Sequence, residues 1–236
     1  MPQTAVAALA SLRKLANKEK AKILQRFFKT GPGQYGAGDK FFGITVPQTR
    51  ELARQYRDLS LTEIKKLLAS PVHESRLLAL MILVLRFPKA SVAEQKQIFN
   101  FYLSVTARVN NWDLVDLSAP QIVGGYLASR DRKILRCLAC SRSLWERRVA
   151  IVSTFYFIRR NEFSPTLDIA RRLLGDPQDL IHKAAGWMLR EVGKRDRKAA
   201  GSFLRRHCRR MPRTMLRYAI ERFPEKTRRR YLNAKN

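Results

Sequence analysis

The chain has 236 residues, 45% of them hydrophobic and 28% charged, which is enough for one large domain or two small ones and does not indicate overall disorder. Lys and Arg number 47 against 19 acidic residues, so the net charge is +28. Such charge opposes compaction and indicates an anionic partner, with nucleic acid first and an anionic membrane second. A basic protein without such a partner is the remaining alternative. No segment has the ~18 uncharged apolar residues of a membrane span, and the longest apolar run, 77–85, is too short.

The first part of the chain predicts one helix and one irregular segment. Residues 1–16 are predicted to form an amphipathic helix that carries Arg13 and Lys14. They lack the order of a secretory signal peptide, so none is expected. Residues 30–38 are rich in glycine but lack the Lys-Ser/Thr ending of a phosphate-binding loop. Two interpretations of this segment stay open: a flexible arm that contacts DNA, or merely a long loop.

Helical periodicity dominates the rest of the chain. Apolar residues recur at three- and four-residue steps, as in 61–68 and 169–174, and alternating strand patterns are missing. Proline near an expected first turn marks helix starts at Ser70-Pro71, Ser164-Pro165, Asp176-Pro177 and Met211-Pro212. These signals predict an all-α fold of about a dozen helices joined by short loops.

A weak repeat runs through these helices. A basic residue followed by an apolar helix recurs at Arg76, Arg148 and Lys183, and the midpoint of the first interval falls on Trp112. A period of about 36 residues is typical of solenoids built from helix pairs. Chance spacing in an all-helical chain is the alternative. If the repeat holds, the second helix of each pair lines a concave face that suits a bound duplex.

The segment from Asn110 to Asp116 is unusual because it concentrates acid in a chain that has little. Asp113 and Asp116 follow Trp112 in an apolar stretch. Residues four apart share a helix face, so the Trp112 indole and the Asp116 carboxylate are predicted to flank one spot. Asp113 is interpreted as part of helix capping, with Asn111 or Asp113 itself as the N-cap. For Asp116, structural and functional roles stay equally open.

The cysteines and histidines predict no metal site. Cys137 and Cys140 form a CxxC within an expected helix, with no second CxxC and no preceding strand. They are interpreted as buried thiols that act as small apolar residues. So few cysteines, in an odd number, indicate a reducing, intracellular compartment. The three histidines are interpreted as isolated: His73, His182 and His207.

Two later segments suggest contacts with an anion or ligand. Arg148 lies among apolar residues and suits a phosphate contact, with a salt bridge to Glu146 or Glu191 as the alternative. Trp187 follows the small residues 184–186, which permit either close helix packing or close approach by a ligand. On the helical pattern alone, the expected place of Trp187 is the core.

Three segments together resemble a known family. They are Trp112-Asp113-Leu114-Val115-Asp116-Leu117-Ser118-Ala119-Pro120, Trp145-Glu146-Arg147-Arg148-Val149-Ala150-Ile151 and Lys183-Ala184-Ala185-Gly186-Trp187-Met188-Leu189-Arg190-Glu191, and the region 35–47 is similar as well. In this order they resemble the DNA alkylation repair glycosylases of the AlkD type, which are built from HEAT-like helical repeats. The resemblance spans most of the chain. One departure is Asn111, where some relatives carry a second aromatic residue.

The resemblance implies roles for individual residues. Asp116 occupies the position of the family's catalytic aspartate, and Trp112 and Trp187 match two tryptophans that contact the lesion nucleotide. Arg148 matches an arginine beside the DNA backbone, and Arg190, in the third segment, is counted with it as DNA-binding. Family members excise N3- and N7-alkylated purines, and enzymes of this type act without fully extruding the base, unlike most glycosylases.

The resulting expectation is a single domain over residues 1–236, an all-α, right-handed solenoid of HEAT-like helix pairs with a basic concave face. Its expected activity is hydrolysis of the N-glycosidic bond of alkylated purines in duplex DNA, which starts base excision repair. We expect no metal or other cofactor, and a monomer that lies in the cytoplasm with the nucleoid and binds no membrane. The rival hypothesis is a non-catalytic protein of the same family that binds DNA structure. A HEAT-like scaffold for protein partners fits the charge less well.

Overall fold

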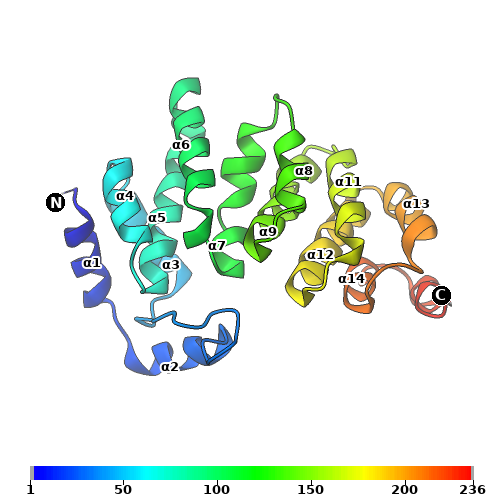
Figure 1. The fold of residues 1–236 in the computed structure, drawn as a ribbon, viewed down its shortest axis with the longest axis horizontal. Helices are drawn as coiled ribbons and strands as arrows, with labels where there is room; N and C mark the ends of the chain where they lie inside the picture. Colours follow the sequence, from blue (N-terminus) through cyan, green and yellow to red (C-terminus); the bar gives the residue numbers. More distant parts are fainter. Residues whose placement is uncertain (1–2, 235–236) are drawn as a thin grey trace. The chain divides into compact units, whose positions relative to one another are not determined.

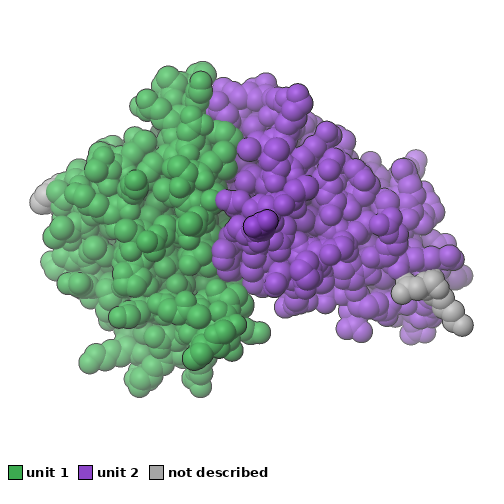
Figure 2. Space-filling model, in the orientation of Figure 1, with its two compact units in different colours: residues 1–118 green, residues 119–236 purple. Residues whose placement is uncertain are grey.

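The computed structural model describes residues 3–234, and most of them are helical (Figure 1). Within this range, extended pairing is limited to one isolated bridge between Lys40 and Val72. The predicted all-α class is therefore confirmed. Contacts divide the chain into two compact units, residues 1–118 and 119–236, which Figure 2 colours separately. The single domain and the right-handed solenoid with its concave face stay predictions.

Unit 1 consists of helices joined by turns, with one long irregular segment after its second helix. In chain order they are α1 (Ala5–Lys14), α2 (Lys18–Phe27), α3 (Val46–Gln55), α4 (Leu61–Leu68), α5 (His73–Arg86), the 3-10 turn η1 (Phe87–Lys89), α6 (Val92–Ser104), the 3-10 turn η2 (Thr106–Arg108) and α7 (Trp112–Asp116). The helices predicted over 1–16 and 61–68 correspond to α1 and α4. The first two residues of the former prediction lie outside the described residues.

Helix α5 forms the core of unit 1. Its residues from His73 to Leu83 are all buried, and α1, α3, α4 and α7 pack on it. A helix that is apolar on all sides is stable only inside a fold, where each buried Leu or Ile contributes about 1.5–3 kcal/mol. The apolar run 77–85 is therefore a core helix. Among the described residues, no helix is long and apolar enough to cross a membrane.

Unit 2 is built around its longest helix, α12, on which α9, α11, α13 and α14 pack. Its elements are the π-helical turn η3 (Pro120–Gly124), α8 (Lys133–Ala139), α9 (Leu144–Ser153), α10 (Phe155–Ile158), α11 (Ser164–Arg172), the 3-10 turn η4 (Leu173–Gly175), α12 (Asp179–Arg195), α13 (Arg197–His207), α14 (Arg213–Ala219) and α15 (Glu225–Leu232). The starts of α11 and α14 confirm two of the proline signals. The basic residues of the suggested repeat lie near the starts of α5, α9 and α12.

Gly186 explains the small residues that precede Trp187. A Cβ atom at Gly186 would lie 2.5 Å from the carbonyl oxygen of Met215 and 2.5 Å from the Cβ of Tyr218, both on α14. Real Cβ atoms do not approach backbone oxygen so closely, and only glycine lets α12 and α14 meet at this point. Of the two alternatives for residues 184–186, the structure supports close helix packing at Gly186.

The interpretation of Cys137 and Cys140 as buried thiols is wrong, because both are exposed. Helix α8 is short and buries the face that carries Leu135, Leu138 and Ala139, which leaves Cys137 and Cys140 on the side that faces solvent. Among the described residues, no group of three or more His, Cys, Asp and Glu side chains is arranged to hold a metal ion. The two thiols therefore contribute neither to the core nor to such a group.

Candidate functional site

Helix α7 carries the two residues of the predicted working face. Asn111 is its N-cap and accepts the Trp112 backbone N–H on Oδ1 at 2.8 Å. Asp116 is its last residue, one turn after Trp112. Both Trp112 and Asp116 are half-buried, so the indole and the carboxylate lie at the boundary between core and solvent on one side of a helix. The expected helix is present, and the roles of the two residues stay predictions.

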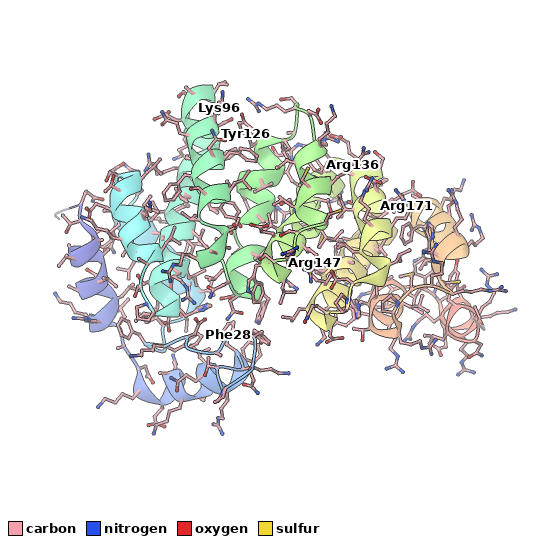
Figure 3. All side chains as sticks on the ribbon, viewed as in Figure 1. Phe28, Lys96, Tyr126, Arg136, Arg147 and Arg171 are labelled. Carbon is pink, nitrogen blue, oxygen red and sulfur yellow. The ribbon has the colours of Figure 1, made fainter. Side chains whose placement is uncertain are left out.

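Trp112 is held by aromatic rings from the end of α2 and the segment that follows it. Phe28, labelled in Figure 3, stacks on Trp112 with ring centroids 5.2 Å apart and planes 19° apart. Phe27 meets the same indole edge-on at 5.9 Å, and Phe28 also stacks on Phe41 at 5.1 Å. Each such pair contributes about 0.5–1.5 kcal/mol beyond the burial of its area. The indole therefore has a supported orientation.

The His73 side chain lies in the core of unit 1 between two carboxylates. Its Nδ1 is 3.3 Å from Asp39 Oδ2, and its Nε2 is 2.8 Å from Asp113 Oδ2. Burial alone lowers the pKa of the imidazole, but the hydrogen bonds to Asp113 and Asp39 outweigh it and raise the pKa of His73 from 6.5 to about 9. At neutral pH, His73 is therefore an imidazolium that donates from both nitrogens.

Two sequence interpretations change as a result. His73 is not isolated, because its partners lie 34 and 40 residues away along the chain. Asp113 is structural, as predicted, but it is not the cap. Asn111 caps α7, while Asp113 lies in the first turn and accepts the Leu114 backbone N–H on Oδ1 at 2.8 Å. Its other oxygen faces His73.

Asp39 joins the glycine-rich segment to the same buried cluster. The Arg76 Nη2 atom lies 2.6 Å from Asp39 Oδ2, although Nη2 is not aligned for a hydrogen bond, so the contact is an ion pair. Burial by itself raises the pKa of Asp39, but His73 and Arg76 outweigh it and lower that pKa. Asn111 donates to the same oxygen at 3.4 Å. Asn111, where some relatives carry an aromatic residue, thus makes a buried polar connection between Asp39 and the start of α7. An aromatic side chain would not supply this pair of hydrogen bonds.

Glu74 fixes residues 42–44, which follow the glycine-rich segment, on α5. Its buried carboxylate accepts the backbone N–H groups of Phe42, Gly43 and Ile44 at 2.8–3.1 Å. Gly43 has φ 81°, and a Cβ atom there would lie 2.1 Å from the carbonyl oxygen of Asn17. Residues 42–44 are therefore fixed, and contact between residues 31–38 and DNA stays a prediction.

The remaining predicted residues lie in unit 2, on α9 and α12. Arg148 is only 5% exposed, and its Nη1 donates to the Leu180 carbonyl oxygen at 2.7 Å, which ties α9 to the start of α12. Trp187 is half-buried, so it does not lie in the core as the helical pattern suggests. Its ring centroid is 5.7 Å from that of Phe155.

Arg190 lies on α12, three residues after Trp187, and pairs with acidic neighbours. It forms ion pairs with Glu191 at 3.4 Å and with Glu221. Its side chain keeps 20% of its surface exposed. The pairs hold the guanidinium in place at the surface of unit 2.

The structure thus places Trp112 and Asp116 at the two ends of α7 in unit 1, and Arg148, Trp187 and Arg190 on two packed helices of unit 2. Sequence reasoning missed the cluster around His73. Its one local signal is the polar run 73–76 at the start of a helix that is otherwise apolar. A polar run in a core helix has to find partners when it is buried.

Comparison with known proteins agrees with this architecture. The family described as DNA alkylation repair enzyme matches residues 8–223. A solved structure of a predicted DNA alkylation repair enzyme from Enterococcus faecalis is similar with a TM-score of 0.69 and 18% sequence identity, covering 89% of this chain and 97% of that one. At this identity the likeness concerns the fold alone. No curated protein matches in sequence. Because the family match spans most of its length, the chain belongs to the DNA alkylation repair enzyme family, and its role lies in DNA repair.

Proposed function

We propose that the protein is a DNA glycosylase that hydrolyses the N-glycosidic bond of N3- or N7-alkylated purines in duplex DNA, and that it acts as a monomer. One observation carries the proposal. On α7, a half-buried Trp112 supported by Phe28 lies one turn from the Asp116 carboxylate, in a chain of the alkylation repair family. An aromatic face and a carboxylate on one side of a helix suit a cationic nucleotide.

The chemistry needs little more than these two groups. Alkylation at N3 or N7 makes the purine cationic, so the base leaves with the electron pair of the glycosidic bond and becomes neutral. The sugar passes through an oxocarbenium-like state, as in other glycoside hydrolyses. A preorganised negative charge stabilises that state. Asp116 supplies the charge and takes a proton from the attacking water. The products are the free alkylated base and an abasic site.

The tryptophans contribute through their electron-rich faces. A cation near an indole face gains about 0.5–2 kcal/mol, depending on how far the pair is desolvated. We assign this contact with the lesion nucleotide to Trp112 in unit 1 and to Trp187 in unit 2. The rings of Phe28 and Phe155 support the two indoles.

Arg148 and Arg190 are proposed to act on the DNA backbone. A guanidinium has five N–H donors, so Arg190 can donate to a phosphate while it stays paired with Glu191 and Glu221. Arg148 is more deeply placed. Its bond to the Leu180 carbonyl oxygen orients the start of α12, which carries Trp187.

The test is release of 7-methylguanine from methylated duplex DNA under single-turnover conditions. We expect Asp116→Asn to lower the rate constant by about 100- to 1,000-fold, the usual cost of losing one preorganised electrostatic group. DNA affinity should stay the same, because the carboxylate does not bind phosphate. A chelator should leave the rate unchanged, because a cationic leaving group needs no Lewis acid.

The matched control is Asp58→Asn, which removes a carboxylate that is 72% exposed and paired with Arg57. It should release base at the wild-type rate. Unchanged release by Asp116→Asn would contradict the assignment. Wild-type protein that binds duplex DNA but releases no base would instead favour the rival, a non-catalytic DNA-structure-binding protein.

A further inference from the structure

We propose that His73 is a positioning residue for α7, and that its positive charge, held between Asp39 and Asp113, keeps Trp112 and Asp116 in the geometry that excises the base. The proposal rests on the proposed function for its effect on catalysis. Its effect on the placement of Trp112 can be measured separately. His73 itself is 2% exposed and does not reach the surface.

Helix α7 depends on such support because it has only five residues. Isolated helices shorter than ~12–15 residues are marginal in water, so the direction of α7 is set by its tertiary contacts. Two of these contacts lie beside Trp112 in the sequence. Asp113 binds His73 at 2.8 Å, and Asn111 binds Asp39 at 3.4 Å. Both lead to the same imidazolium, since Asp39 is the second carboxylate on His73.

A second connection runs through the rings. The His73 ring centroid lies 4.7 Å from that of Phe41 and 4.9 Å from that of Phe28. Phe28 in turn stacks on Trp112. A cation near aromatic faces is attracted to them, and the attraction disappears when the cation loses its charge. The charge of His73 therefore stabilises both the carboxylate beside Trp112 and the ring that supports Trp112.

The charged groups around His73 determine what happens when its proton leaves. Asp39 faces it from the position directly after the glycine-rich segment, Asp113 from α7 and Arg76 from α5 itself. Glu74, its neighbour, is engaged by the backbone N–H groups of residues 42–44. When His73 is neutral, Arg76 is the remaining cation near the buried carboxylates of Asp39 and Asp113. The neutral ring also donates only one of the two hydrogen bonds that the imidazolium donates. Asp113 and α7 then lose their fixed position.

The pH dependence of base release gives the test. For the wild type, the single-turnover rate constant should fall as the pH rises through about 9, the pKa of His73. In Asp113→Asn, this alkaline limb should move to lower pH by about 1–3 units, since an opposite charge has been removed from His73. Asp39→Asn should move it in the same direction. Rates are corrected for release without enzyme at each pH.

His73→Gln keeps a hydrogen-bonding side chain but removes the charge. We expect its rate constant at pH 7 to fall by about 10- to 100-fold, the cost of a small misplacement of catalytic groups, and the alkaline limb to disappear. DNA affinity should remain near the wild-type value. The control His207→Gln, at a histidine of unit 2, should leave the limb in place.

A fluorescence measurement separates this inference from the proposed function. In a Trp145→Phe, Trp187→Phe background, Trp112 is the single indole, and its emission should titrate over the same pH range and shift with Asp113→Asn. If the wild type releases no base, the proposed function fails and the emission still tests the placement of Trp112. If Asp116→Asn abolishes release while Asp113→Asn shifts neither the limb nor the emission, the positioning role alone is overturned. Should His73→Gln fail to fold, the two aspartate variants decide.

Discussion

At the scale of single residues, the orientation of Trp112 depends on Phe28. The Phe28 ring is 7% exposed and touches Trp112, Phe41 and His73. We expect Phe28→Ala to lower the free energy of unfolding by about 3–5 kcal/mol, because it opens a cavity among these rings. Phe27→Ala is the matched control, since Phe27 is 60% exposed and meets Trp112 only edge-on. Urea unfolding compares the two variants. An equal loss of unfolding free energy in both would show that the stacked Phe28 ring stabilises the fold no more than the exposed Phe27 ring does.

The charge of His73 also makes a prediction about stability. Its pKa is 6.5 when exposed and about 9 in the fold, so the native state binds the proton more tightly. The stability that His73 contributes is therefore complete below pH 6.5, falls between pH 6.5 and 9, and is lost above pH 9. At 1.36 kcal/mol per pKa unit, the contribution is roughly 3 kcal/mol. The measurement is the difference in urea unfolding between wild type and His73→Gln at pH 6 and pH 9.5.

The wild-type advantage over His73→Gln should shrink between these two pH values. The comparison with the variant cancels the groups that titrate in both proteins, such as the lysines and cysteines. A constant difference across the range would mean that His73 stabilises unit 1 by packing, without its charge.

Residue-level prediction from the sequence succeeds where the relation is local. The spacing of Trp112 and Asp116 predicts a helix that carries both residues, and α7 is that helix. Asp113, His73 and Asp39 come from three separate segments, and no periodic pattern records which side chains meet across a core. The prediction that Cys137 is buried fails for a related reason, since the sequence of a short helix does not reveal which of its faces packs.

At the scale of elements, the packing of α12 on α14 gives a prediction with an internal control. Gly186→Ala places a methyl group 2.5 Å from the Met215 carbonyl oxygen, so the two helices must separate. We expect a loss of about 1–3 kcal/mol, as for other overpacked sites. Gly193, on the same helix, has its nearest atoms at 3.4 Å, on Ala200 and Phe223. Gly193→Ala should be neutral or stabilise by up to about 1 kcal/mol, since alanine favours the helix.

Thermal unfolding of the two variants is the measurement. A lower midpoint for Gly186→Ala with a normal or higher one for Gly193→Ala supports the packing argument. Equal unfolding midpoints for the two variants would mean that α12 and α14 can separate without a loss of stability. Trp187 follows Gly186 directly, so a shift of α12 should also reduce base release by Gly186→Ala.

Elements themselves are largely predictable from the sequence, because helix starts depend on local chemistry. Pro165 in the first turn of α11 and Pro212 before α14 mark boundaries that the structure confirms. The π-helical turn at Pro120–Gly124 is not predictable in this way. There a Cβ atom on Gly124 would lie 2.4 Å from the Ser153 carbonyl oxygen, a close contact with α9 that only the fold defines.

At the scale of the whole molecule, the excess of basic residues far exceeds what intrachain pairing can use. In unit 2, Asp168 alone pairs with Arg136, Arg171 and Arg172, the first two of which are labelled in Figure 3. With 47 basic and 19 acidic residues, most guanidinium and ammonium groups have no carboxylate of their own. A polyanion such as DNA is the partner that neutralises such an excess.

This excess predicts strongly salt-dependent DNA binding. Each phosphate that the protein neutralises contributes about −0.9 to the slope of log Kobs against log salt concentration, so an interface with six or more contacts has a slope of about −5 or steeper. Fluorescence anisotropy with unmodified duplex between 50 and 300 mM salt measures it. Asp116→Asn should keep the wild-type slope even though it loses base release, since a carboxylate contacts no phosphate. A shallow slope would contradict a phosphate-based interface.

Arg190→Gln tests one contact within that slope. If Arg190 binds a phosphate, the slope should become less negative by about 1. The same variant also leaves Glu191 and Glu221 without this partner, which weakens binding at every salt concentration through repulsion of the DNA. The two effects are distinguishable, because repulsion by these two carboxylates leaves the number of displaced counterions, and hence of phosphate contacts, unchanged. A weaker affinity with the wild-type slope would therefore assign to Arg190 only its ion pairs with Glu191 and Glu221.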